Sequence, residues 1–254
     1  MTIGIFDSGM GGISVLYEAM KYLPHENFIY YGDSKNAPYG VKTKEEVIDL
    51  SISICDKFIG MEVDAIVVAC NTATSAAVKV LRKKYGIPII GMEPALKPAV
   101  QNNHGKGIVV MATEMTLKEK KFSMLMSNVA SNQKIYKVPA SKIVTLVESN
   151  QFDERMINEV IKNYFSHISN FESIVLGCTH FIFIKNNLKD IFGEQIKIID
   201  GNFGTVMQLK RKLEARGKLR REGKGSLKIM NSAGEKMINL SYELLEKLEV
   251  QNGN

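Results

Sequence analysis

Three segments from the first half of the chain recur in the second half at nearly constant spacing. AIVVACNT (65–72) matches SIVLGCTH (173–180), TIGIFDSG (2–9) matches GIVVMATE (107–114), and IPIIGMEP (87–94) matches IKIIDGNF (196–203). Each segment is a short apolar run that ends in small or polar residues, a pattern typical of a buried strand followed by a loop. The repetition predicts an internal duplication in which two similar domains share one architecture.

Strand-like and helix-like patterns alternate along the first half of the chain. We expect strands at 2–6, 27–31, 65–69 and 87–91, and helices at 12–22, 44–61 and 75–85. Because strands separated by helices form parallel βαβ units, we predict an α/β fold of two pseudo-symmetric domains with mainly parallel sheets. The domains are expected at 1–97 and 98–206, with residues 207–254 packing back on the first. Since ligands of open α/β sheets bind beyond the carboxyl ends of the strands, we expect the active site in the cleft between the domains.

The composition is that of an ordinary globular protein. The 254 residues are 45% hydrophobic and 24% charged. No apolar run reaches the roughly 18 residues of a membrane span, and the first residues do not read as a signal peptide. We therefore expect a cytoplasmic protein without a membrane partner. Three cysteines in such a chain argue against a disulfide framework and leave thiols for chemistry or packing.

The net charge of +6 is concentrated in one stretch. Residues 210–228 hold nine Lys and Arg residues, opposed only by Glu214 and Glu222. Such a stretch can bind anionic partners, but no aromatic residue stands within it to stack on bases. We interpret it as a solvated helix end and loop, and we do not expect nucleic acid as a partner.

Two of the three cysteines stand in matching polar contexts. Cys70 follows a run of five apolar residues and precedes a helix that Thr72 or Thr74 could cap. The positive end of that helix would lower the pKa of a nearby thiol and could also hold a carboxylate. Cys178 has the same context, with His180 two residues on as a proton partner. Cys55 falls in the middle of a predicted helix, so we interpret it as a packing residue.

Polar residues also follow other predicted strands and would face the same cleft. They are Asp7 and Ser8, Asp33 and Ser34, the turn Pro38-Tyr39-Gly40, and Thr113 and Thr116. Each has a structural alternative, because turns and helix caps favour the same residue types. No Cys/His/carboxylate cluster has metal-ligand spacing, and no motif marks a nicotinamide, flavin or ATP site. We therefore predict neither a metal nor a cofactor.

Taken together, these segments resemble the glutamate racemase family of the aspartate/glutamate racemase superfamily. The resemblance runs from Ile3 to about Gly201. It is carried by GIFDSGMGG (4–12), YYGDS (30–34), APYG (37–40), VACNTAT (68–74), GMEPALKPAV (91–100) and GCTH (177–180). Two features depart from the family pattern: Phe181-Ile182 replaces a frequent Tyr-Pro, and Asp200-Gly201 replaces Asp-Ser. The first leaves the shape of the loop after Cys178 open.

The resemblance implies a role for each matching residue. Cys70 and Cys178 would be the two acid/base thiols of a cofactor-independent isomerase that interconverts L- and D-glutamate, with Asp7 and His180 assisting them respectively. The substrate would be held by Asp7, Ser8, Asp33, Ser34, Pro38, Tyr39, Gly40, Asn71, Thr72, Thr113, Thr116 and Thr179. The product D-glutamate would feed peptidoglycan synthesis, and so cell wall biogenesis and cell shape. Family members pair in different ways, so a homodimer is one assembly that the resemblance allows.

Alternative functions differ in what they require of the two cysteines. An aspartate or hydantoin racemase of the same superfamily would use both. A cysteine hydrolase would need only one Cys/His pair, so the matching second cysteine counts against it. A binding module without turnover, for a solute or for DNA, would be expected to carry a damaged cysteine site, whereas both sites are intact.

Overall fold

The computed structural model describes residues 1–254 except 93–94, 102–104, 119–132, 152, 218 and 253–254. The chain forms two compact units, one made of residues 1–93 and 202–254, the other of 94–201. The sequence placed the divisions at 97/98 and 206/207. We describe each unit by itself.

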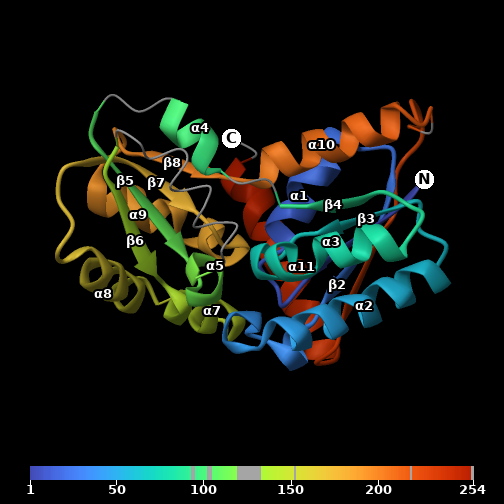
Figure 1. The fold of residues 1–254 in the computed structure, drawn as a ribbon, viewed down its shortest axis with the longest axis horizontal. Helices are drawn as coiled ribbons and strands as arrows, with labels where there is room; N and C mark the ends of the chain where they lie inside the picture. The colour runs from blue at the N-terminus through green and yellow to red at the C-terminus, as the bar shows by residue number, and fades with distance from the viewer. Residues whose placement is uncertain (93–94, 102–104, 119–132, 152, 218, 253–254) are drawn as a thin grey trace. The chain divides into compact units, whose positions relative to one another are not determined.

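Unit 1 is built around a five-stranded sheet of order β4-β3-β1-β2-β9 in which every neighbouring pair is parallel. Its elements, in chain order, are β1 (Thr2–Asp7), α1 (Ile13–Tyr22), β2 (Asn27–Gly32), η1 (Ser34–Asn36), η2 (Tyr39–Val41), α2 (Lys44–Gly60), β3 (Ala65–Val68), α3 (Asn71–Lys84), β4 (Ile89–Gly91), α10 (Asn202–Glu214), β9 (Leu227–Asn231) and α11 (Glu235–Asn252). Helices α2 and α3 lie together on one face of the sheet, and α1, α10 and α11 lie on the other (Figure 1).

Helix α2 shows how local sequence and packing agree in this unit. It begins at a capping box, in which Thr43 accepts from the backbone of Glu46 and the Glu46 side chain accepts from the backbone of Thr43. Val47, Ile54 and Phe58 are among its buried residues and recur at the spacing of one helix face. The Phe58 ring covers β1 where Gly4 leaves room for it, since a Cβ there would meet the ring at 2.9 Å.

Unit 2 holds a four-stranded sheet of order β6-β5-β7-β8, again parallel throughout. Its elements are α4 (Leu96–Gln101), β5 (Gly107–Ala112), α5 (Glu114–Lys118), β6 (Ile135–Pro139), α7 (Ser141–Glu148), α8 (Glu154–Phe165), β7 (Phe171–Leu176), η3 (Thr179–Ile184), α9 (Lys185–Phe192) and β8 (Lys197–Asp200). Buried residues of α7, α8 and η3 pack on one face of this sheet, and α4 packs on the other.

The two sheets repeat one topology. The sequence matches pair β1 with β5, β3 with β7 and β4 with β8, so the order β4-β3-β1-β2 of unit 1 corresponds to β8-β7-β5-β6 of unit 2. The prediction of an α/β fold from two similar domains with parallel sheets is therefore confirmed. Strand β9 has no counterpart in unit 2 among the described residues.

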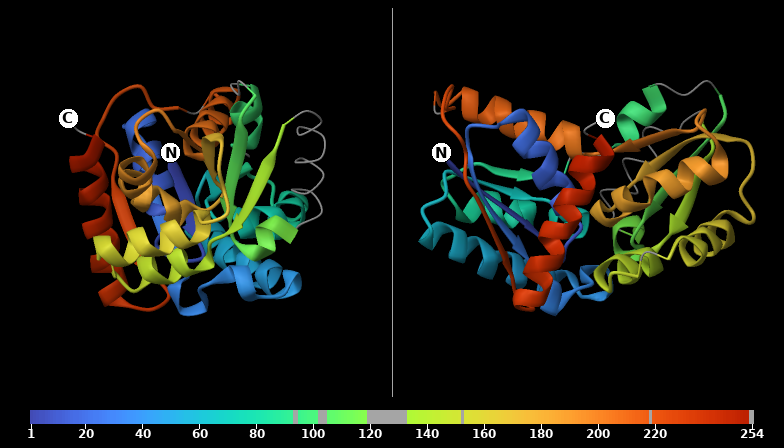
Figure 2. Two further views of the ribbon diagram at one scale, coloured as in Figure 1. Left: turned by 90° about the vertical axis from the view of Figure 1, so that its left-hand side faces the viewer. Right: turned by 180° about the vertical axis from the view of Figure 1, so that it is seen from behind.

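Strand β9 comes from the segment after residue 206 and adds an edge strand to unit 1. It pairs in parallel with β2 from Phe28↔Leu227 to Gly32↔Asn231 (Figure 2). The basic stretch leads into it from the end of α10. Its described Lys and Arg residues are exposed apart from the half-buried Lys210, and Lys218 lies outside the described residues.

One predicted boundary is wrong. The helix after Cys70 begins at Asn71, four residues before the expected position, and neither Thr72 nor Thr74 caps it. The N-cap is Cys70 itself. Thr74 instead donates its hydroxyl to the carbonyl of Val68 at 3.0 Å.

No helix of the described residues is long and apolar enough to cross a membrane.

Candidate active site

The carboxyl ends of three neighbouring strands bring the predicted residues of unit 1 together. Asp7 ends β1, Asp33 follows β2, and Cys70 lies two residues beyond β3. Because β1 lies between β2 and β3 in a parallel sheet, these residues emerge at the same edge. Asp7, Asp33 and Cys70 are all buried there.

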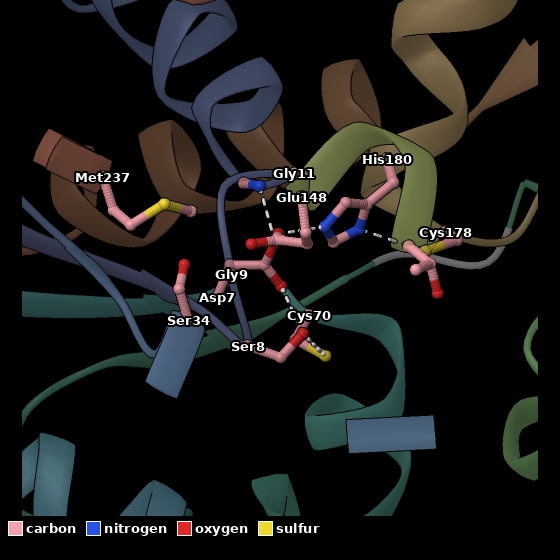
Figure 3. A network of polar contacts seen from close by, with 12 residues as sticks. Asp7, Ser8, Gly9, Gly11, Ser34, Cys70, Glu148, Cys178, His180 and Met237 are labelled. Atoms are coloured by element: carbon pink, nitrogen blue, oxygen red, sulfur yellow. Dashed lines mark hydrogen bonds and ion pairs between the residues drawn. The ribbon is translucent and has the colours of Figure 1, made fainter. Parts of the chain in front are cut away.

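The Cys70 sulfur has polar contacts on two sides (Figure 3). As the N-cap of α3, it accepts a hydrogen bond from the Ala73 amide at 3.4 Å. Its thiol donates to Ser8 Oγ at 3.5 Å. The amide and the helix N-terminus both favour negative charge on the sulfur. The arrangement therefore supports a thiolate as well as a thiol at this position.

A backbone amide fixes the Asp7 carboxylate next to Ser8. The Gly12 amide donates to Asp7 Oδ2 at 2.6 Å, a short charge-assisted bond. Ser8 Oγ lies 3.5 Å from Asp7 Oδ1, longer than an ordinary O–H···O bond, so this contact contributes little energy. Gly12 is required sterically, because a Cβ would lie 2.6 Å from the Cβ of Asp7.

The turn after β2 is held by the Asp33 carboxylate. Tyr39 donates its hydroxyl to Asp33 Oδ2 at 2.6 Å, and the Asn36 amide lies 3.1 Å from both carboxylate oxygens. Burial raises the pKa of Tyr39, and its bond to Asp33 and the nearby Cys70 and Asp7 raise it further. Tyr39 is therefore a permanent hydrogen-bond donor at this site.

The other predicted binding residues of unit 1 line the same edge. Ser34, Pro38 and Gly40 are half-buried in the turn. Asn71 and Thr72 form the first turn of α3 directly after Cys70, with Asn71 half-buried and Thr72 buried.

In unit 2, Cys178 follows β7 as Cys70 follows β3, but its partners differ. Its Sγ lies 3.5 Å from Nδ1 of His180, and Nε2 of His180 lies 2.6 Å from Glu148 Oε1 (Figure 3). His180 is 2% exposed and Glu148 14%, whereas Cys178 is half-buried. The three side chains thus form a chain from sulfur through imidazole to carboxylate.

The pKa of the His180 imidazole is raised by its two neighbours. Burial by itself lowers its pKa, but the adjacent Cys178 sulfur and the Glu148 carboxylate outweigh burial and raise the pKa well above its usual value. A protonated imidazole donates from both nitrogens, so it can donate to Glu148 on one side and to the Cys178 sulfur on the other.

The threonines of unit 2 are buried near the ends of β5 and β7. Thr113 precedes α5; its Oγ1 accepts from the Thr116 amide at 3.3 Å and donates to Thr116 Oγ1 at 3.0 Å. Thr113 thus makes the helix-cap contacts that the sequence analysis gave as its structural alternative. Thr179 lies between Cys178 and His180 and is 2% exposed.

Sequence reasoning missed Glu148. It ends α7 and lies 32 positions before its partner His180. Nothing in the local pattern distinguishes it from an ordinary glutamate at the end of an amphipathic helix. Cys55 is the packing residue that the sequence predicted, since it is fully buried in α2 and burial raises its pKa to about 12.

The described residues contain no group of three or more His, Cys, Asp or Glu side chains that could hold a metal ion.

Comparisons with known proteins agree on one family. The family model described as Asp/Glu/Hydantoin racemase matches residues 14–209. A glutamate racemase of Clostridium botulinum (strain Alaska E43) is 49% identical over 249 residues, which cover 96% of either chain. The crystal structure of glutamate racemase isoform RacE1 from Bacillus anthracis superposes with a TM-score of 0.87 at 25% identity, covering 96% of this chain and 94% of that one.

A second solved structure is that of glutamate racemase from Francisella tularensis in complex with D-glutamate. It has a TM-score of 0.84 at 26% identity and covers 96% of this chain and 93% of that chain. The matches extend over nearly the whole length of this chain and of its relatives. The chain therefore belongs to the Asp/Glu/Hydantoin racemase family, on its glutamate racemase branch.

Proposed function

We propose that this chain interconverts L- and D-glutamate without a cofactor, and that Cys70 and Cys178 exchange the α-proton. Relatives at about half identity are named glutamate racemases, and the Francisella tularensis structure contains D-glutamate. The observation that carries the mechanism is the repeated placement of a cysteine. Cys70 and Cys178 follow equivalent strands of the two repeats, and each contacts a group that can share its proton.

The reaction needs a base on one face of the α-carbon and an acid on the other. By resemblance, the Cys70 thiolate takes the α-proton of D-glutamate, and the Cys178 thiol delivers its own proton to the opposite face. The enzyme then holds a Cys70 thiol and a Cys178 thiolate, which is the form that accepts L-glutamate. Protons and charge balance, and no redox step occurs.

Each thiolate has its own support in this proposal. Negative charge on Cys70 is stabilised by the Ala73 amide and the N-terminus of α3. Negative charge on Cys178 is stabilised by a His180 imidazolium that Glu148 holds in place. We assign Asp7 to assist Cys70, as the resemblance implies; the Gly12 amide fixes its carboxylate beside Ser8, whose hydroxyl contacts the Cys70 thiol.

Hydroxyl, amide and backbone groups bind the substrate. We assign this role to the remaining predicted residues, namely Ser8, Ser34, Pro38, Tyr39, Gly40, Asn71, Thr72, Thr113, Thr116 and Thr179. Asp33 has a different role in this proposal, because its carboxylate bonds to Asn36 and Tyr39 and so shapes the turn.

A coupled assay with four substrates tests the reaction. We expect turnover of both L- and D-glutamate and at least 100-fold lower kcat/KM for both aspartates, in line with the discrimination that buried polar contacts provide (on the order of 10²-fold or more). Activity should persist after treatment with a chelator and with a carbonyl reagent. Equal or faster turnover of aspartate, or activity that pyridoxal phosphate restores, would contradict the proposal.

We further propose that the reaction occurs in the cytoplasm and supplies D-glutamate for peptidoglycan synthesis. None of the three cysteines forms a disulfide, as is usual in a reducing compartment. The gene should therefore rescue a bacterial strain that depends on added D-glutamate. A Cys70→Ser variant is the matched control and should fail to rescue. Rescue by that variant, or none by the wild type, would contradict this role.

A further inference from the structure

The C-terminal strand β9 ends beside the turn that follows β2. Asn231, the last residue of β9, donates its side-chain amide to Ser34 Oγ at 3.0 Å. The next residue, Ser232, accepts the backbone N–H of Lys35 at 3.0 Å through its hydroxyl, and donates its own N–H to the Gly32 carbonyl at 2.9 Å. Two consecutive residues of the C-terminal segment therefore bond to the end of β2 and to the first two residues of η1.

The Asn231 side chain is itself held in one orientation. Its Oδ1 accepts the Ala233 amide at 2.9 Å, while Nδ2 reaches Ser34. Gly32 leaves space for it, since a Cβ on Gly32 would lie 2.6 Å from Asn231 Nδ2. Both ends of the Asn231 side-chain amide are hydrogen-bonded, and Gly32 lies close against it. The side chain is therefore held in one orientation and is not a mobile surface group.

The far end of the same turn lies next to the candidate catalytic group of unit 1. The Tyr39 hydroxyl bonds to Asp33 at 2.6 Å, and η2, which Tyr39 begins, lies against α3, the helix that Cys70 caps. Residues 33–40 are thus bonded to β9 at one end and lie against the Cys70 helix at the other. A displacement of Ser34 or Lys35 would be transmitted to Tyr39, because the Asp33 carboxylate bonds to both Asn36 and Tyr39.

We propose that Asn231 and Ser232 are positioning residues, which hold the turn 33–40 in the shape that presents Pro38, Tyr39 and Gly40 to the substrate. The proposal rests on the proposed function for the identity of that substrate. It gives a role in the site to a segment beyond residue 209, where the match to the family model ends.

Removal of one hydroxyl at either end of β9 tests the proposal. Ser232→Ala deletes the acceptor of the Lys35 amide, and Ser232→Thr restores a hydroxyl. Ser226→Ala is the matched control, because Ser226 bonds its hydroxyl to Asn27 Oδ1 at 3.0 Å at the opposite end of the β2–β9 pair. Asn231→Ala is the second test variant. Melting temperatures are measured for all four.

Loss of one hydrogen bond that positions a binding turn should weaken binding by about three- to tenfold. We expect Ser232→Ala and Asn231→Ala to raise KM by that factor for both enantiomers, with kcat changed less than about twofold, as for loss of uniform binding. Ser232→Thr should return KM to near the wild-type value, and Ser226→Ala should leave it unchanged. Unchanged KM in both test variants, or an equal rise in Ser226→Ala, would overturn the proposal.

Hydrogen exchange without substrate separates this proposal from the proposed function. The amides of Lys35, Asn36 and Lys42 should exchange faster in Ser232→Ala than in Ser226→Ala, because the turn has lost its anchor. If the wild-type protein does not racemise glutamate, the proposed function fails, and the exchange comparison alone decides the positioning role. Equal exchange in the two variants would then overturn it.

Discussion

The Cys70 and Cys178 sites occupy equivalent positions in two repeats, yet different chemical groups surround the two sulfurs. Cys70 is 5% exposed, caps α3 and contacts a serine hydroxyl. Cys178 is half-buried, makes no side-chain capping bond to η3 although it is the N-cap residue, and contacts an imidazole that is bonded to Glu148. A backbone amide at a helix N-terminus contacts the first sulfur, whereas a titratable side chain contacts the second.

The difference shows what duplication supplies and what it does not. A repeated βα unit places a cysteine beyond each strand, because the same apolar pattern forms the same strand. The side chains beside the two sulfurs come from outside the repeated unit: Ser8 follows β1, and Glu148, which bonds to His180, ends α7. Position is therefore inherited from the repeat, and the neighbouring side chains are particular to each site.

Removal of either thiol should have the largest effect. Because general acid–base catalysis contributes about 10²–10⁴-fold, Cys70→Ser and Cys178→Ser should each lower kcat/KM for racemisation by roughly 10³-fold or more. Enantiomers have equal free energies, so kcat/KM must fall equally in both directions for each variant. Cys55→Ser is the control and should lose stability in the buried α2 packing while keeping its kcat. Wild-type turnover by either active-site variant would show that its thiol is dispensable.

Alkylation should distinguish the two thiols by rate. Cys178 is more exposed and is paired with an imidazole, so iodoacetamide should modify it more than about tenfold faster than Cys70. Cys55 should react slowest, because it is fully buried and its pKa is raised to about 12. Peptide mapping after timed labelling gives the three rates. His180→Asn should slow labelling of Cys178 alone, and an equal slowing of Cys70 would contradict the separate support of the two sites.

Glu148→Gln should shift the pH dependence of the Cys178 site. The charged Glu148 carboxylate raises the pKa of His180, so its neutral replacement should move the imidazole titration, followed by NMR, to lower pH. Loss of a charged hydrogen bond should also lower kcat about tenfold. Glu159→Gln, at an exposed position of α8, is the control. An unchanged His180 titration would contradict the assignment.

The loss of stability in Glu148→Gln should also depend on pH. The folded-state pKa of His180 lies above the unfolded value of about 6.5, so its charged form stabilises the fold fully below that pH. This contribution is lost as pH rises through the folded-state pKa. The deficit in unfolding free energy of Glu148→Gln should therefore be largest in acid and shrink in alkali.

The smallest predicted effect concerns one position of the repeat itself. Ser173 in β7 matches Ala65 in β3, and its buried hydroxyl has no hydrogen-bond partner among the described residues. Ser173→Ala should stabilise unit 2 by about 1 kcal/mol, because it removes an unsatisfied polar group. Ala65→Ser is the reciprocal variant and should destabilise unit 1. Denaturant unfolding measures both, and loss of stability in Ser173→Ala would show that the hydroxyl has a partner in solution.

Repetition made much of the fold, and the matching positions of Cys70 and Cys178 after β3 and β7, predictable from the sequence. The strands ending near Asp7, Gly32 and Val68 were found because buried parallel strands are continuous apolar runs. The start of α3 was misplaced because Asn, Thr and Ser favour caps over helix interiors, while the actual cap is a cysteine sulfur.

The residues that were missed depend on tertiary contacts between distant parts of the chain. Glu148 meets His180 across 32 positions, and Asn231 meets Ser34 across 197. Neither contact can be recognised from the local sequence, because each depends on which elements are neighbours in the fold. Sequence therefore indicated candidate catalytic side chains and not the side chains that contact them.

Elimination by the single-thiol variants tests the central claim most directly. A glutamate analogue with a leaving group next to the α-carbon loses its α-proton and that group with one base, and needs no proton from the other face. Cys70→Ser should therefore still process the L-analogue through Cys178, and Cys178→Ser should still process the D-analogue through Cys70. Each variant should be inactive toward the opposite enantiomer. If both variants lose the same enantiomer, or both process either one, then the two cysteines do not serve opposite faces.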